Sequence, residues 1–327
     1  MTAIPSGAVR TVLGDIDASS LGVTYAHEHL VIDPGRPVEL FPDFQLDDVD
    51  RIVTEVEAAR AAGLEAAVDA MPCDAGRNVV KLAAIARRTG LNVIAPTGLH
   101  HGRYYRSGHW SEGASAEELG ALFIADILDG IDERDYSGPL VRRTEHRAGV
   151  VKVAGSHDGP SARDQRVFEA AAIAHIETGV PILTHCEEGT GALEQLRFLG
   201  ERGVPASSIA LSHVDKVVDR GYHREILSTG AFVEYDQSFR WGQDRENGTL
   251  TLLGWMLEDD FGGQVLLGMD AARQGYLRAF GGAPGLAWLL EGFSGLMSEH
   301  GIGDAERLRF FVDNPARAFA ASGGAAT

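Results

Sequence analysis

Short apolar segments recur along the chain, and many of them are bounded by Gly, Pro or Asp. Most are continuous apolar runs, in which apolar and polar residues do not alternate. Such runs are typical of parallel strands that are buried on both faces of a sheet. The pattern predicts eight strands, which occupy residues 22–29, 65–72, 91–98, 149–156, 180–187, 208–215, 230–237 and 263–270.

Amphipathic helical patterns separate most of these segments. Residues 48–63 carry an apolar stripe with the period of a helix, and both this segment and residues 162–179 end at a glycine. Residues 115–130 open with Ser115 and Glu118, which have the spacing of a capping box. The sequence therefore predicts helices between the strands.

An alternation of eight strands with helices predicts an α/β fold, a (β/α)8 TIM barrel, formed as one domain by residues 1–327. A short strand segment at about residues 7–21 would precede the barrel, and the tail at about residues 321–327 is expected to be frayed. The alternative is an open doubly wound sheet. That fold usually carries a G-x-G-x-x-G motif after its first strand, and no such motif is found here.

The composition narrows the class of partner. A net charge of −18 argues against binding to nucleic acid or to an anionic membrane. We expect neither a membrane-spanning helix nor a signal peptide, because no apolar run is long enough and no basic leader opens the chain. Two cysteines, Cys73 and Cys186, are too few for a disulfide framework. These features predict a cytoplasmic protein that acts on a small molecule.

Polar side chains end several of the predicted strands, where a core would favour an aliphatic residue. His27 and His29 end the first strand, His185 the fifth, His213 the sixth and Asp270 the eighth. In a (β/α)8 barrel, the C-terminal ends of the strands meet at one face and carry the chemistry. Imidazole and carboxylate groups together suit Zn²⁺ and similar divalent ions, and five ligands exceed what one tetrahedral zinc takes. The pattern predicts a site for two metal ions.

Side chains alternate between the two faces of a strand. His27 and His29 should therefore share one face, while Glu28 points toward the helical layer and needs a partner there, such as an arginine or a backbone amide. By the same alternation, Cys186 should face away from the site.

Lys152 lies among valines in the fourth predicted strand. Burial lowers the pKa of an amine, and a neutral amine can react with CO₂ to give a carbamate. A carbamate has two oxygens and a negative charge, which suit a bridge between two cations. The alternative is a paired lysine whose amine extends outward.

These motifs, taken in order, resemble the phosphotriesterase family of the amidohydrolase superfamily. The matching segments are YAHEHL, VVKVAG, ILTHCEEG, LSHVD and LLGMD, followed by DNPARAF at 313–319. The resemblance implies a binuclear centre whose more buried ion is held by His27, His29 and Asp270. It also implies that His185 and His213 hold the more exposed ion, and that carboxylated Lys152 and a hydroxide bridge the two.

The resemblance also implies an activity and its cofactors. Zn²⁺ is the first expectation for the two ions, with Mn²⁺, Co²⁺ and Fe²⁺ as alternatives, and the carbamate on Lys152 comes from CO₂. The bridging hydroxide would attack an ester or lactone carbonyl, with Asp270 as the proton shuttle. No organic cofactor is expected, and a homodimer is a common outcome for such barrels.

Cationic and aromatic residues follow the strand ends and form the candidate substrate site: His100, Arg103, Tyr104, Lys216, Arg273 and Tyr276. They could form surface ion pairs, or they could clamp an anion. A clamp favours a lactonase for an anionic lactone, such as a phosphorylated sugar lactone. His100 departs from the aromatic residue that relatives often carry there, which leaves the leaving-group preference open. The alternatives are an organophosphate triesterase or arylesterase, an N-acyl amino acid amidase, and a non-catalytic barrel that retains the metals.

Overall fold

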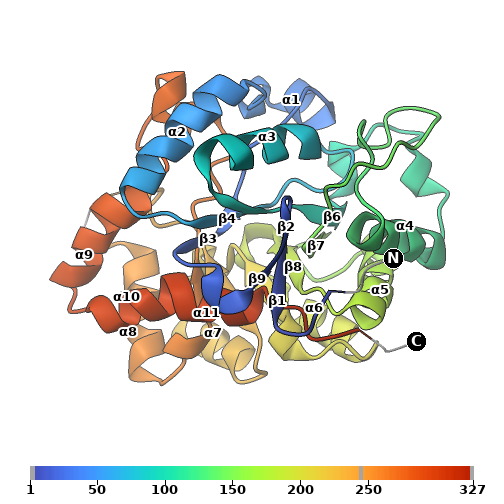
Figure 1. Cartoon of the computed structure of the whole chain (residues 1–327). Helices are drawn as coiled ribbons and strands as arrows, with labels where there is room; N and C mark the ends of the chain where they lie inside the picture. The colour runs from blue at the N-terminus through green and yellow to red at the C-terminus, as the bar shows by residue number, and fades with distance from the viewer. Residues whose placement is uncertain (1–3, 243–245, 325–327) are drawn as a thin grey trace.

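The computed structural model describes residues 4–242 and 246–324. A ring of parallel strands lies inside a layer of helices (Figure 1). All eight predicted segments form strands of this ring. The strands are β3 (Thr24–Glu28), β4 (Ala66–Asp69), β5 (Asn92–Ile94) with β6 (Pro96–Leu99), β7 (Val150–Gly155), β8 (Ile182–Cys186), β9 (Ile209–Ser212), β10 (Phe232–Tyr235) and β11 (Val265–Leu267).

The ring closes between its first and last strands. Strands β3, β4 and β5 pair in parallel, as do β6 to β11, and only Ala95 separates β5 from β6. After β11, the amides of Met269 and Asp270 donate to the carbonyl of His27 at 3.3 and 3.0 Å. The segment after β11 therefore lies against β3. This arrangement confirms the (β/α)8 barrel and excludes the open sheet.

Helices cover the outside of the ring (Figure 1). The capping box of Ser115 and Glu118 is formed as predicted, and the 162–179 helix ends at Gly179 with φ 73°. No helix in the described ranges is long and apolar enough to cross a membrane. The helices are α1 (Arg36–Leu40), α2 (Val49–Ala61), α3 (Val79–Thr89), α4 (Ala116–Leu128), α5 (Ala162–Thr178), α6 (Ala192–Gly200), α7 (Arg220–Leu227), α8 (Gly248–Glu258), α9 (Ser294–Glu299), α10 (Asp304–Leu308) and α11 (Asn314–Ala318).

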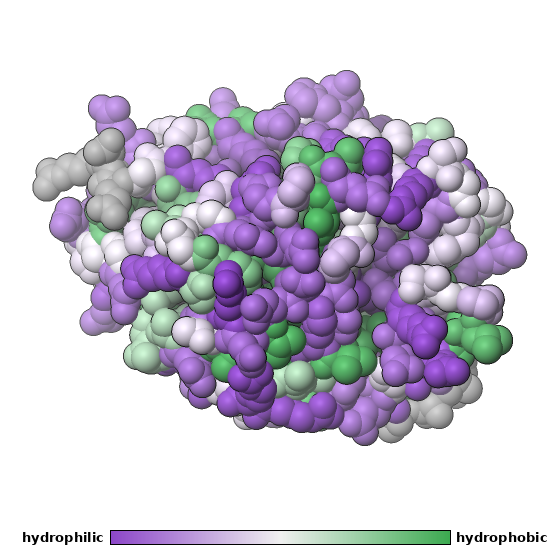
Figure 2. Space-filling model, turned by 90° about the horizontal axis from the view of Figure 1, so that it is seen from above, coloured by the Kyte–Doolittle hydropathy of each residue, from purple (hydrophilic) through white to green (hydrophobic). Residues whose placement is uncertain are grey.

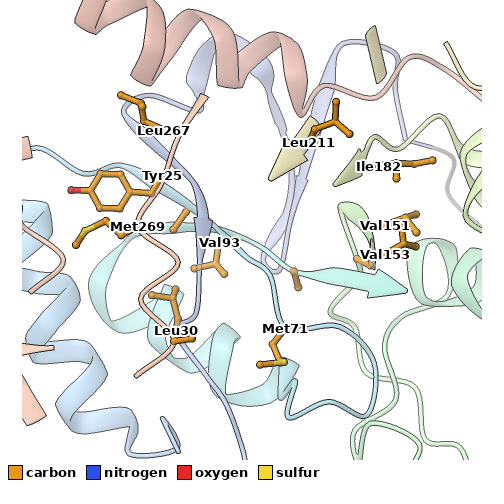
Figure 3. Close-up of a cluster of buried hydrophobic side chains, with 14 of the residues drawn as sticks. Tyr25, Leu30, Met71, Val93, Val151, Val153, Ile182, Leu211, Leu267 and Met269 are labelled. Atoms are coloured by element: carbon orange, nitrogen blue, oxygen red, sulfur yellow. The ribbon is translucent and has the colours of Figure 1, made fainter. Parts of the chain in front are cut away.

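The apolar residues form two packed regions. Val151 and Val153 of β7 belong to the larger one, which joins the strands to the helices (Figure 3). Val150 and Leu183 belong to the smaller one, which fills the barrel interior. By contrast, the outer surface is mostly hydrophilic on the face shown in Figure 2, with apolar residues in separate patches.

A hairpin near the N-terminus of the chain closes the barrel at the N-terminal ends of its strands. Strands β1 (Ala8–Thr11) and β2 (Gly14–Asp17) pair antiparallel within the predicted 7–21 segment, and Val9 packs into the interior cluster. In the predicted tail, Ala321 donates its amide to Ala8 at 2.8 Å, while residues 325–327 lie outside the described ranges. The opposite, C-terminal end of the strands is therefore the open end.

Candidate metal centre

A cavity of about 240 Å³ lies at the C-terminal ends of the strands. The structure brings every predicted site residue to this one cavity. Its lining includes the six predicted metal ligands and the six predicted substrate residues, which are His27, His29, Lys152, His185, His213 and Asp270, and His100, Arg103, Tyr104, Lys216, Arg273 and Tyr276.

Strand β3 and the segment after β11 bring three ligand atoms together. The rings of His27 and His29 are 5.5 Å apart on the same side of β3, as their spacing predicts. Oδ1 of Asp270 lies 3.1 Å from Nε2 of His29 and 3.8 Å from Nε2 of His27. The three residues each offer one ligand atom, and these atoms lie within 4.8 Å of one another. This set has the nitrogen and oxygen donors that a zinc-like ion takes.

Glu28 takes the opposite face of β3 and fixes the position of Asp270. Its buried carboxylate accepts hydrogen bonds from the amides of Met269 at 2.8 Å and Ala271 at 3.4 Å, on either side of Asp270. Burial raises the pKa of Glu28, and these two hydrogen bonds oppose the rise. The expected partner of Glu28 is therefore a pair of backbone amides.

Two predicted ligands adopt left-handed backbone conformations. Asp270 has φ 48° and His213 has φ 68°. Such angles are uncommon for residues other than glycine, and they cost free energy that the surrounding structure must supply. Strained residues of this kind cluster at functional sites, which agrees with a built site at these two strand ends.

Arg240 also contacts Asp270, and the sequence analysis did not include it. Its Nη2 lies 3.1 Å from Oδ2 of Asp270 and donates to the Asp270 carbonyl at 2.7 Å. Burial alone would raise the pKa of Asp270, but the hydrogen bond with His29 and the charge of Arg240 hold it well below its usual range. Asp270 is therefore a carboxylate at neutral pH.

Acceptors hold one ring nitrogen of each of three predicted histidine ligands. Nδ1 of His213 lies 2.5 Å from Asp236, and Nδ1 of His27 lies 3.0 Å from Ser212 Oγ. Nε2 of His185 lies 2.9 Å from Glu187. Such acceptors fix the tautomer and leave the other ring nitrogen as a lone-pair donor for a metal. The residues present therefore fit divalent ions.

Lys152 is buried among these groups. Its Nζ lies 3.5 Å from Ser212 Oγ, and burial lowers its pKa to about 8, while the nearby carboxylates Glu234 and Asp270 oppose the decrease. Glu234 is itself buried, 3.3 Å from Nδ1 of His27. Lys152 therefore faces the predicted ligands and does not extend to solvent.

Two of the buried carboxylates beside the histidines had a signal in the sequence. Glu234 and Asp236 are two residues apart at the end of the 230–237 segment, the same spacing as His27 and His29. This spacing places both carboxylates on the same side of the chain, Glu234 within β10 and Asp236 directly after it. Arg240 follows in the next loop, where no such periodicity applies.

The predicted substrate residues differ in their partners. Arg103 forms two contacts with Glu187, at 2.9 and 3.0 Å, and Arg273 lies 2.6 Å from Asp43. Lys216 has no ion pair within the described part of the chain. Lys216 is therefore the predicted rim cation that is available to a ligand.

His100 and the two predicted tyrosines complete the rim. The ring of His100 lies 4.6 Å from that of Tyr104 and 5.2 Å from that of His185. The ring of Tyr276 packs against Phe239 at 4.9 Å. His100 thus stands beside a predicted metal ligand, where it can contact a bound molecule.

Comparisons with known proteins agree with this geometry. The sequence profile of the phosphotriesterase family matches residues 7–319. The chain is 31% identical to a phospho-furanose lactonase of Mycoplasmopsis synoviae (strain 53), over 95% of this chain and 91% of that protein. A crystal structure of an amidohydrolase from Mycoplasma synoviae superposes with a TM-score of 0.92 at 30% identity, covering 97% of this chain and 93% of that one.

A second solved structure shows the same likeness. The lactonase from Listeria monocytogenes superposes with a TM-score of 0.88 at 28% identity, covering 96% of this chain and 99% of that one. The family match thus covers nearly the whole chain, and the ligand cluster lies where the motifs place it. The chain therefore belongs to the phosphotriesterase family and is a metal-binding hydrolase that acts on ester bonds.

Proposed function

We propose that this enzyme is a lactonase for an anionic lactone, with a phosphorylated furanose lactone as the substrate class. One observation carries the proposal: Lys216, without an ion pair in the described residues, lines the same cavity as the metal-ligand cluster. Arg240 gives the cavity a second cation beside Asp270. Cations at a cavity rim bind phosphate strongly. The name of the Mycoplasmopsis relative supports the same substrate class.

We further propose that the centre is binuclear, with Zn²⁺ as the first expectation. His27, His29 and Asp270 would hold one ion, His185 and His213 the other, and Lys152 would join both as a carbamate. The lowered pKa of Lys152 supports this, because carbamate formation needs the neutral amine. When bound, such ions supply an activated water and polarise the lactone carbonyl.

In this proposal, the side chains bind the substrate and move one proton. Lys216 and Arg240 would orient the phosphate and thereby place the lactone carbonyl over the centre. Water forms a bond to the carbonyl carbon, and the ring C–O bond breaks. The carboxylate of Asp270 accepts the proton that water releases and donates it to the leaving ring oxygen, which gives a hydroxy acid.

A substrate panel tests the proposal. We expect kcat/KM to be highest for phosphorylated furanose lactones, lower for neutral lactones, and lowest for paraoxon-like esters. A preference for paraoxon-like esters would contradict the proposal. A preference for N-acyl amino acids would indicate an amidase, whose substrate carboxylate would use the same cations. No turnover by a fully metal-loaded protein would indicate a binding barrel.

The proposed location and assembly follow the sequence analysis. Both cysteines are free and buried. We propose that the enzyme acts in the cytoplasm, since free thiols suit a reducing compartment. A homodimer also stays a prediction, which sedimentation of the purified chain would test.

A further inference from the structure

Glu187 connects a predicted metal ligand to the loop that follows β6. Its Oε2 lies 2.9 Å from Nε2 of His185 and 3.0 Å from Nε2 of His101. Both terminal nitrogens of Arg103 also contact its two carboxylate oxygens. His101 and Arg103 follow β6, while His185 and Glu187 lie at the end of β8. Three side chains, from the segments that follow β6 and β8 on either side of β7, thus meet at the carboxylate of Glu187.

These contacts determine which nitrogen of His185 can bind an ion. With Nε2 donating to Glu187, the lone pair is on Nδ1, which makes no hydrogen bond in the described ranges. The ring of His185 lies 4.5 Å from that of His213. Without Glu187, the ring could rotate or change tautomer, and its lone pair would no longer be fixed.

His101, His185 and Glu187 do not form a separate metal site, because the positive charge of Arg103 lies against Glu187. His101, His185 and Glu187 offer three ligand atoms within 4.8 Å. However, Arg103 already occupies both oxygens of Glu187, and its guanidinium would repel a cation there. The rings of His101 and His185 lie against the other side of the same carboxylate, at 3.0 and 2.9 Å from its Oε2. Glu187 is thus a fixed acceptor.

We infer that Glu187 is a positioning residue for His185: it fixes the ring so that Nδ1 serves as the metal ligand, and His101 and Arg103 hold Glu187 in place. This inference rests on the binuclear centre of the proposed function. It adds a residue beyond the six predicted ligands, and it ties metal binding to the loop after β6.

Co²⁺ binding to the full chain tests the inference, with no substrate involved. In E187A, the affinity for one of two Co²⁺ ions should decrease by about 10- to 100-fold, the usual effect of losing the partner of a ligating histidine. Its visible absorption bands should shift as well, because the geometry at that ion changes. E187Q should lose less, because its amide oxygen can still accept one imidazole N–H.

E188Q is the matched control. Glu188 is exposed, lines the same cavity, and makes no ion pair or side-chain hydrogen bond in the described ranges. The same loss of charge at the neighbouring position should leave the affinity and the bands unchanged. If E187A fails to fold, the graded loss in E187Q carries the test.

The outcomes separate this inference from the proposed function. Two Co²⁺ ions bound to E187A and E187Q with wild-type affinity and bands would overturn it, even if both variants melted at a lower temperature. An equal loss of Co²⁺ affinity in E188Q would also overturn the inference, because the loss of one negative charge near the cavity would then explain the result for Glu187. Failure of the wild-type chain to bind two ions would instead refute the binuclear centre itself.

Discussion

The two ends of the barrel interior differ in chemistry although the same strands build both. Near the N-terminal end the inward side chains are apolar, and the hairpin of β1 and β2 closes them off. Two residues further along, the inward side chains are polar. The pairs are Val150 and Lys152 in β7, Leu183 and His185 in β8, Ala210 and Ser212 in β9, and Phe232 and Glu234 in β10.

The difference shows that the residues that stabilise the barrel and the residues that form the candidate site are neighbours along the same strands. Two residues of a strand advance by about 6.6 Å, so one pleat separates the packed layer from the polar layer. The polar layer is still buried, as Lys152, Ser212 and Glu234 show. Burial of such groups is costly unless they are paired. The apolar layer and the hairpin therefore have to stabilise a polar layer that serves the metal site.

The largest effect on metal binding and activity is expected from replacing Lys152, the polar residue of the Val150 and Lys152 pair in β7. Lys152→Ala should abolish binding of the second metal ion and lower kcat/KM for a lactone by at least about 1,000-fold, equivalent to about 4 kcal/mol. The reason is the loss of the proposed bridging carbamate. Metal analysis and steady-state kinetics measure both effects.

Lys81→Ala is the control for this variant. Lys81 lies on α3 and pairs with Asp33, outside the metal cavity. The Lys81→Ala variant should bind two metal ions and keep the wild-type kcat/KM. Retention of both ions by Lys152→Ala would refute the carbamate.

The next effect separates the two layers on β8. Leu183→Ala should lower the free energy of unfolding by about 3 kcal/mol, because it opens a cavity in the packed interior. It should leave the metal content of the folded protein unchanged. His185→Ala should do the reverse, with loss of metal and a smaller change in the stability of the metal-free protein. Chemical denaturation and metal analysis of both variants test this contrast, and equal effects on the two readouts would remove the proposed division between layers.

The smallest effect is expected at the rim. Lys216→Met should raise KM for a phosphorylated lactone about 10-fold, since a hydrogen bond to a charged group contributes about 1.5 kcal/mol. KM for a neutral lactone should change less than about 2-fold. Lys81→Met is the control and should change neither value. An equal rise for both lactones would show that Lys216 shapes the cavity but does not bind the anion.

The sequence predicted the strands and the strand-borne residues better than the loops. Parallel strands buried on both faces leave clear apolar runs, and a histidine or lysine that interrupts such a run is conspicuous. Lys152 and His213 were found in this way. Glu234 and Asp236 were not predicted, although their two-residue spacing is visible, because acidic residues near a strand end are also common in surface loops.

The contacts of the loops could not be predicted. Glu187 and Glu188 are adjacent and chemically identical, yet only Glu187 contacts His185. The choice depends on the backbone turn at Glu188, where φ is 52°. Arg240 reaches Asp270 from a different loop, 30 residues away in the sequence. Such pairings arise from tertiary packing, which no local period encodes.

The closure of the ring has a consequence for biosynthesis. His29 and Asp270 are 241 residues apart in the sequence, yet they contribute to one cluster across the seam between β3 and the segment after β11. During translation, the histidines leave the ribosome long before the aspartate that completes their site. A metal ion held by this set would cross-link the first and last strands of the barrel. Full occupancy of the site would then report that the chain had been made through Asp270 and that the barrel had closed.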